Sequence, residues 1–184
     1  WCESAHNKLP AYNRPEILEA DLATLALDIT QWGINDPGKL TWLDPPPPAH
    51  YAQARELLQE LGALDHNGAI TAHGRRMSQL AMHPRLAHMV LMGMELGHGA
   101  LACDLAALLS ERDIINTRFS AGGLKGARDA DLHQRLQALR NTSEIEGVDR
   151  GTCARARKQA EQWRRQLRIS DYDTAHTDHT GLLL

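Results

Sequence analysis

Apolar residues recur three and four positions apart along most of the chain, which is the spacing of amphipathic helices. Glycine and proline residues mark where several of these periodic segments begin or end. The helices we expect cover residues 15–32, 49–61, 71–80, 84–96, 100–110, 128–140 and 151–168. The pattern therefore predicts a mainly α protein.

One stretch, GALDHNGAITAHGRRM at residues 62–77, interrupts the helical spacing. Asn67-Gly68 is the dipeptide favoured in type I′ turns, where both central residues have positive φ. Leu64 precedes this turn and Ile70 follows it. We therefore expect a small β-hairpin between two helices.

The order of the elements is helix, extended segment, helix and β-hairpin, which is typical of a winged-helix domain. We assign this domain to residues 16–80 and a helical bundle to residues 81–168. In the proline-rich connector at 34–48, we expect Leu40, Trp42 and Leu43 to pack on the core. Residues 1–15 are interpreted as a lead-in from an upstream region, and residues 169–184 as a linker and the start of a truncated C-terminal region. The first residue is Trp1 and the last four are GLLL, so we expect a piece of a longer protein.

Composition supports packed helices. Apolar residues make up 42% of the 184 residues, yet there are only one Phe, three Tyr and four Trp, so Leu and Ala must supply most of the core. The three cysteines are far apart and form no C-x-x-C pair, which favours free thiols and a cytoplasmic location. We find neither a membrane-spanning apolar run nor a signal peptide, and expect no membrane association.

Charge is distributed unevenly along a chain whose formal net charge is −3. Residues 1–124 carry a net charge of −5 and residues 125–168 a net charge of +5. Within the basic part, residues 151–168 predict a helix with cations off its apolar stripe. Such a face suits contacts with nucleic-acid phosphates, although a simply solvated face explains it equally well. The candidate nucleic-acid-binding residues are Arg155, Arg157, Lys158, Arg164, Arg165 and Arg168.

No other motif predicts chemistry. His83 and His88 are five residues apart and no H-E-x-x-H occurs, so no metal site is expected. The glycine-rich GGLKG at 122–126 lacks the spacing of a phosphate-binding loop. We therefore predict no catalytic residues.

Several spaced motifs resemble the region that follows the helicase core in DEAH-box helicases. Their sequences are most similar to those of the bacterial HrpB-type branch. They include PEI at 15–17, DPP at 44–46, LGAL at 61–64, Gly68, Thr71, Gly74, PRL at 84–86 and ALLSERD at 107–113. The similarity is strong over residues 1–115 and looser over 128–168.

This resemblance implies a parent protein that is an ATP-dependent RNA or nucleic-acid helicase. It implies RecA-like domains upstream, which use ATP and Mg²⁺, and a further domain downstream. The winged-helix and ratchet (helicase-associated) domains would couple that motor to single-stranded nucleic acid. This chain has no ATPase motif, so alone it should be inactive and need no cofactor.

Two other functions remain open at this point. The chain could be a winged-helix DNA-binding regulator, although Glu56 and Glu60 beside Arg55 suit a DNA groove poorly. It could also be a protein-interaction hub that binds no nucleic acid.

Overall fold

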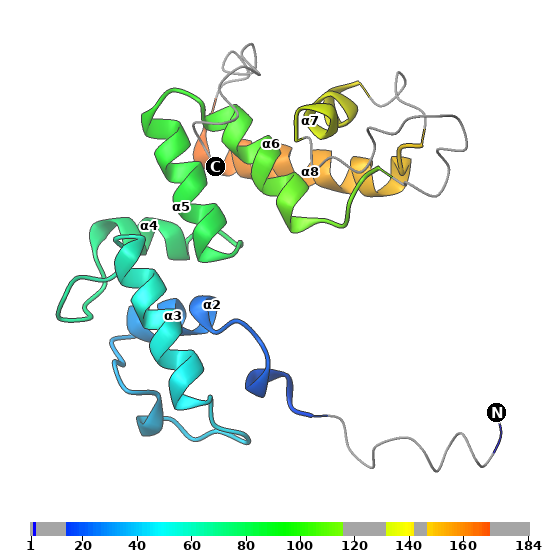
Figure 1. Ribbon diagram of the computed structural model, residues 1–184. Helices are drawn as coiled ribbons and strands as arrows, with labels where there is room; N and C mark the ends of the chain where they lie inside the picture. Colours follow the sequence, from blue (N-terminus) through cyan, green and yellow to red (C-terminus); the bar gives the residue numbers. More distant parts are fainter. Residues whose placement is uncertain (1, 3–13, 116–131, 142–146, 170–184) are drawn as a thin grey trace. The chain divides into compact units, whose positions relative to one another are not determined.

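The chain forms two compact units, residues 1–79 and residues 80–184 (Figure 1). The computed structural model describes residues 2, 14–115, 132–141 and 147–169. These residues are mainly helical, which confirms the predicted fold class. Most of the predicted lead-in, the glycine-rich loop at 122–126 and nearly all of the predicted linker lie outside the described residues.

Among its described residues, the first unit contains three helices and two single 3₁₀ turns. They are η1 (Glu16–Leu18), α2 (Ala23–Gln31), η2 (Pro37–Lys39), α3 (Pro48–Glu60) and α4 (Ala72–Ser78). Helix α2 packs against both α3 and α4. Their buried side chains include Leu27, Ile29, Leu58 and Met77. The spacing of the apolar residues placed α3 and α4 within one or two residues of these bounds.

The single helix predicted from Pro15 to Trp32 is wrong. The chain makes one 3₁₀ turn at η1 and enters α2 only at Ala23. Before α2, the Asp21 carboxylate accepts a hydrogen bond from the Ala23 N–H at 2.8 Å. This satisfies a first-turn amide and starts a new helix. Trp32, just after α2, is 71% exposed and lies off the buried stripe.

The connector at 34–48 is held by Trp42. Its indole N–H donates to the Pro37 carbonyl oxygen at 2.8 Å. Leu43, which the sequence led us to place on the core, is 99% exposed. The backbone bends at Leu43, and its side chain points to solvent while Trp42 is half-buried and held by its hydrogen bond.

The predicted β-hairpin is reduced to one antiparallel bridge between Leu64 and Ile70. In the turn, the Gly68 N–H donates to the Asp65 carbonyl oxygen at 2.9 Å. Gly68 has a φ of +77°, whereas Asn67 does not have a positive φ, so the turn is not type I′. The Asp65 carboxylate accepts the Asn67 and Ala69 N–H groups, both at 2.8 Å. Side-chain capping thus stabilises a turn that has almost no strand ladder.

Helix α4 approaches this turn closely. The Thr71 hydroxyl caps α4 by accepting the Gly74 N–H at 3.0 Å and donates to the Gly62 carbonyl oxygen at 2.6 Å. A Cβ atom on Gly74 would collide with the Ala63 carbonyl group. Glycine at position 74 is therefore required by the packing of α4 against backbone.

The second unit contains four helices within its described residues (Figure 1). They are α5 (Pro84–Glu95), α6 (Gly99–Ser110), α7 (Leu132–Arg140) and α8 (Arg150–Leu167). Helix α6 is central, because it packs against α5, α7 and α8 and is buried from Gly99 to Leu108. In the part of the chain that the structure describes, we find no helix long and apolar enough to cross a membrane.

Replacing Gly74 with Ala should destabilise the first unit. The added methyl group meets backbone atoms of Ala63 that cannot rotate away. We expect a loss of about 1–3 kcal/mol in the free energy of unfolding, typical of overpacking, measured by urea denaturation. Gly151→Ala is the control, because its Cβ would meet side-chain atoms alone, Asp149 Oδ1 at 3.3 Å and Arg155 Nη1 at 3.9 Å, and no backbone atom. Equal effects of the two substitutions would contradict the close approach.

Candidate nucleic-acid interface

Helix α8 begins with a strong cap. One carboxylate oxygen of Asp149 accepts the N–H groups of Gly151 and Thr152 at 2.9 and 3.1 Å. The other accepts the Thr152 hydroxyl at 2.9 Å. Ala156, Ala160 and Trp163 lie on the buried stripe that packs the helix onto the unit. The cap and the stripe together determine which side chains of α8 face solvent.

Four exposed side chains form one line along α8. Arg155, Lys158, Gln162 and Arg165 are spaced by three, four and three residues, which places them on one face of a helix. We call these four residues the α8 ridge. Arg168 is also exposed, but it follows the helix end in the left-handed region, with a φ of +56°. It therefore lies beyond the ridge.

The ridge cations are only weakly neutralised. Arg155 pairs with Glu111 at 3.5 Å and Arg165 with Glu161 at 3.4 Å. Ion pairs between exposed side chains contribute little and exchange readily with solvent and ligands. Lys158 has no ion-pair partner among the residues that the structure describes. The ridge can thus present three cations to a polyanion.

Two of the six predicted residues do not face solvent. Arg164 is 16% exposed and donates to a carboxylate oxygen of Asp104 at 2.7 Å. The Arg157 Nε–H donates to the Leu139 carbonyl oxygen at 3.0 Å. Both residues are among the candidate nucleic-acid-binding residues, but in the structure they are only partly exposed and bonded to neighbouring helices. On the helix they flank the buried stripe, and their long side chains reach into it.

Asp104 is the buried charge that the sequence analysis missed. It lies on α6 with 3% of its side chain exposed, between Arg164 and Arg140, whose guanidinium is 3.3 Å away. Burial raises the pKa of Asp104, and the two arginines oppose that rise. A lone carboxylate within the apolar run LACDLAALL was the available signal, because such a residue needs a cationic partner.

The buried Cys103 thiol on α6 is not a candidate nucleophile. Burial raises the pKa of the Cys103 thiol to about 12, which leaves almost no thiolate at neutral pH. We find no group of three possible metal ligands among the described residues.

Replacing Asp104 with Ala should strongly destabilise the second unit. The substitution leaves Arg140 and Arg164 without their shared carboxylate, and breaking a buried pair costs about 3 kcal/mol or more. Glu161→Ala removes the exposed partner of exposed Arg165 and should cost about 1 kcal/mol or less. Urea denaturation of both variants tests this. A cost for Asp104→Ala no greater than for Glu161→Ala would contradict the central role of Asp104.

The Asp149 cap should make the stability of α8 depend on pH in the acidic range. Hydrogen bonds from Thr152, backbone first and then hydroxyl, lower the pKa of Asp149. Its contribution is therefore complete above the unfolded value of about 3.9 and is lost as the pH falls through the lower folded value. Asp149→Asn keeps a capping oxygen but does not titrate. We expect thermal denaturation of this variant to vary less with pH below about 4 than that of the original chain, and an identical pH profile would refute the assignment.

Comparisons with known proteins show that this chain is similar to RNA helicases. A family model described as the winged-helix part of the helicase associated domain (HA2) matches residues 54–82. The ATP-dependent RNA helicase HrpB of Escherichia coli is 41% identical over 101 residues, which are 55% of this chain and 12% of that protein. The probable ATP-dependent RNA helicase DHR2 of Saccharomyces cerevisiae is 29% identical over 181 residues, or 92% of this chain and 24% of that protein. The chain thus spans a quarter or less of the length of these curated relatives.

Solved structures agree with these relatives. The crystal structure of the E. coli DEAH/RHA helicase HrpB matches 91% of this chain and 18% of that one, with 27% identity and a TM-score of 0.65. A second, of the E. coli DExH-box NTPase HrpB, matches 86% of this chain and 20% of that one, with 31% identity and a TM-score of 0.53. The predicted resemblance is confirmed: the chain is similar to E. coli HrpB and contains a match to the helicase associated domain.

Proposed function

We propose that this chain is the accessory region of an ATP-dependent RNA helicase and couples its motor to single-stranded RNA. The observation that carries the proposal is the similarity to E. coli HrpB over 91% of the chain. The partners we propose are single-stranded nucleic acid, upstream RecA-like domains and a downstream C-terminal domain of the same protein. In that protein, RecA-like domains would hold ATP and Mg²⁺, and the location would be the cytoplasm.

The proposal also assigns a role to each predicted domain. Residues 16–80 would be the winged-helix domain that connects to the motor. Residues 81–168 would form the ratchet that contacts RNA, and residues 169–184 would lead into the next domain. This chain alone should not hydrolyse ATP.

The α8 ridge is our candidate for the RNA contact. Its three cations are exposed at a spacing of three and seven residues along one rigid helix. Phosphate contacts of this kind supply affinity without selecting a sequence, as a translocating enzyme requires. Arg168 would add a fourth cation near the helix end. Arg157 and Arg164 would act only indirectly, by holding α8 in place.

The first unit does not favour sequence-specific DNA binding. On α3, the Arg55 guanidinium donates to the Asn35 carbonyl oxygen at 2.9 Å, while Glu56 and Glu60 are exposed. Two carboxylates on the exposed face of a helix repel the phosphates that border a groove. This supports the helicase interpretation over a winged-helix regulator.

Neutralising the ridge should weaken RNA binding and its dependence on salt. We expect the triple variant Arg155→Gln, Lys158→Gln and Arg165→Gln to lower the slope of log K against log salt by about 2, since each phosphate contact to a single strand contributes about 0.7. Fluorescence anisotropy of a labelled single-stranded RNA, measured across a salt series, gives this slope.

The control carries the same change in charge at exposed positions elsewhere. The variant Arg75→Gln, Arg85→Gln and Arg112→Gln should keep the original slope, because these side chains are exposed outside the ridge. Equal slopes in the two variants would refute the ridge as the contact. Absence of RNA binding by the unaltered chain would favour the protein-interaction hub.

A further inference from the structure

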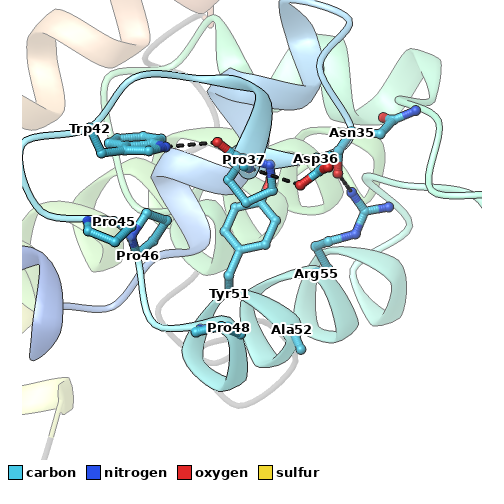
Figure 2. Close-up of a pocket in the computed structure, with 11 residues that line it drawn as sticks. Asn35, Asp36, Pro37, Trp42, Pro45, Pro46, Pro48, Tyr51, Ala52 and Arg55 are labelled. Atoms are coloured by element: carbon cyan, nitrogen blue, oxygen red, sulfur yellow. Dashed lines mark hydrogen bonds between the residues drawn. The ribbon is translucent and has the colours of Figure 1, made fainter.

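A pocket of about 550 Å³ opens in the first unit between the connector at 34–48 and the start of α3 (Figure 2). One wall is apolar and includes Trp42, Pro45, Pro46 and Tyr51. This volume lies within the range of sites that bind small molecules, and a mainly apolar lining with few polar groups is typical of them. The proposed RNA contact on α8 does not involve this pocket.

The aromatic wall is held in place. The hydrogen bond from the Trp42 indole N–H to the Pro37 carbonyl oxygen fixes the plane of the ring. Pro45 and Pro46 restrict the backbone that follows. A flat ligand could therefore stack on Trp42 without first ordering the side chain.

The other end of the pocket is polar and carries both signs of charge. One Asp36 carboxylate oxygen accepts the Gly38 N–H at 2.9 Å, and the Arg55 guanidinium donates to the Asn35 carbonyl oxygen at 2.9 Å. Both side chains are thus oriented by backbone groups (Figure 2). An acceptor and a set of donors lie together at one end.

Tyr51 adds a buried hydroxyl that lacks a regular partner. The residue is 5% exposed, and among the described residues its hydroxyl makes no hydrogen bond of ordinary geometry. The Arg55 guanidinium is close enough to lower the pKa of Tyr51, but burial dominates and raises it. The phenol therefore stays protonated at neutral pH. The geometry of the Arg55 contact leaves hydrogen-bonding capacity of the Tyr51 hydroxyl unfilled, so a ligand in the pocket could satisfy it.

The charges select the kind of ligand. Arg55 disfavours a cation and Asp36 disfavours an anion, so the polar end suits a neutral edge with neighbouring donors and acceptors. The aromatic wall suits a planar ring. We propose that this pocket binds an unpaired nucleobase of a single strand, which stacks on Trp42 and directs its hydrogen-bonding edge toward Tyr51, Asp36 and Arg55. As a site on an RNA strand, it rests on the function proposed above.

The test compares a single-stranded RNA with an abasic strand of the same length. Trp42→Ala should weaken binding of the RNA about tenfold, because stacking one base on an aromatic ring contributes about 1–3 kcal/mol. It should leave binding of the abasic strand unchanged. Trp32→Ala is the matched control, because Trp32 is 71% exposed and does not line the pocket; it should change neither affinity.

A second variant keeps the inference testable if Trp42→Ala does not fold. Asp36→Asn retains an oxygen for the Gly38 N–H but removes the charge at the polar end. It should also weaken binding of the RNA and not of the abasic strand. Circular dichroism and melting temperature establish the folding of each variant.

Calorimetric titration with uncharged guanosine separates the pocket from the α8 ridge. Trp42-dependent binding of guanosine supports the pocket even if no strand binds, in which case only the proposed RNA contact fails. Salt-dependent strand binding that is insensitive to both pocket variants, with no binding of guanosine, overturns the pocket and leaves the proposed function intact. Equal losses on the RNA and the abasic strand also overturn it.

Discussion

The carboxylate of Asp104 is the meeting point of three helices in the second unit. It projects from α6, and its two oxygens face Arg140 of α7 and Arg164 of α8 at 3.3 and 2.7 Å. A charge buried to this degree is tolerated only when partners replace the water it has lost. The apolar contacts of Ala-rich α6 are non-directional, whereas these ion pairs are directional. They therefore reinforce the orientation in which the apolar stripe of α8 packs inward.

The arrangement explains why one helix needs so many arginines. The cations beside the apolar stripe bond to groups of α6 and α7. Arg164 neutralises Asp104 of α6, and Arg157 donates to the Leu139 carbonyl oxygen at the end of α7. The cations on the opposite side, at Arg155, Lys158 and Arg165, are left to solvent. Counting charge along the sequence cannot separate these two groups, because both lie off the Ala and Trp stripe. Their partners in the folded unit separate them, namely the Asp104 carboxylate for Arg164 and the Leu139 carbonyl oxygen for Arg157.

Helical periodicity predicted α3, α5, α6 and α8 within one or two residues, because each buries a regular apolar stripe. It failed where a local polar group changes the backbone. The Asp21 carboxylate accepts the Ala23 amide where a new helix begins within a continuous apolar pattern, and the Asp65 carboxylate accepts two amides of the turn at Asn67-Gly68. Both depend on a side chain bonding to a backbone amide two to four residues away, which competes with regular structure. The apolar pattern does not contain that information.

Arg55 shows how such a local bond also changes the use of a surface. It lies on α3, which carries exposed Glu56 and Glu60. If its guanidinium were unbonded, Arg55 would be the cation that α3 offers to the phosphates beside a nucleic-acid groove. Its guanidinium instead bonds the Asn35 carbonyl group and covers Gly68, where a Cβ atom would collide with it. Arg55 therefore links α3 to the connector and to the turn, and the same contacts place it at the polar end of the Trp42 pocket. Because the guanidinium is engaged in these contacts, Arg55 is not available to bind phosphate from the surface of α3, which presents Glu56 and Glu60 to solvent instead.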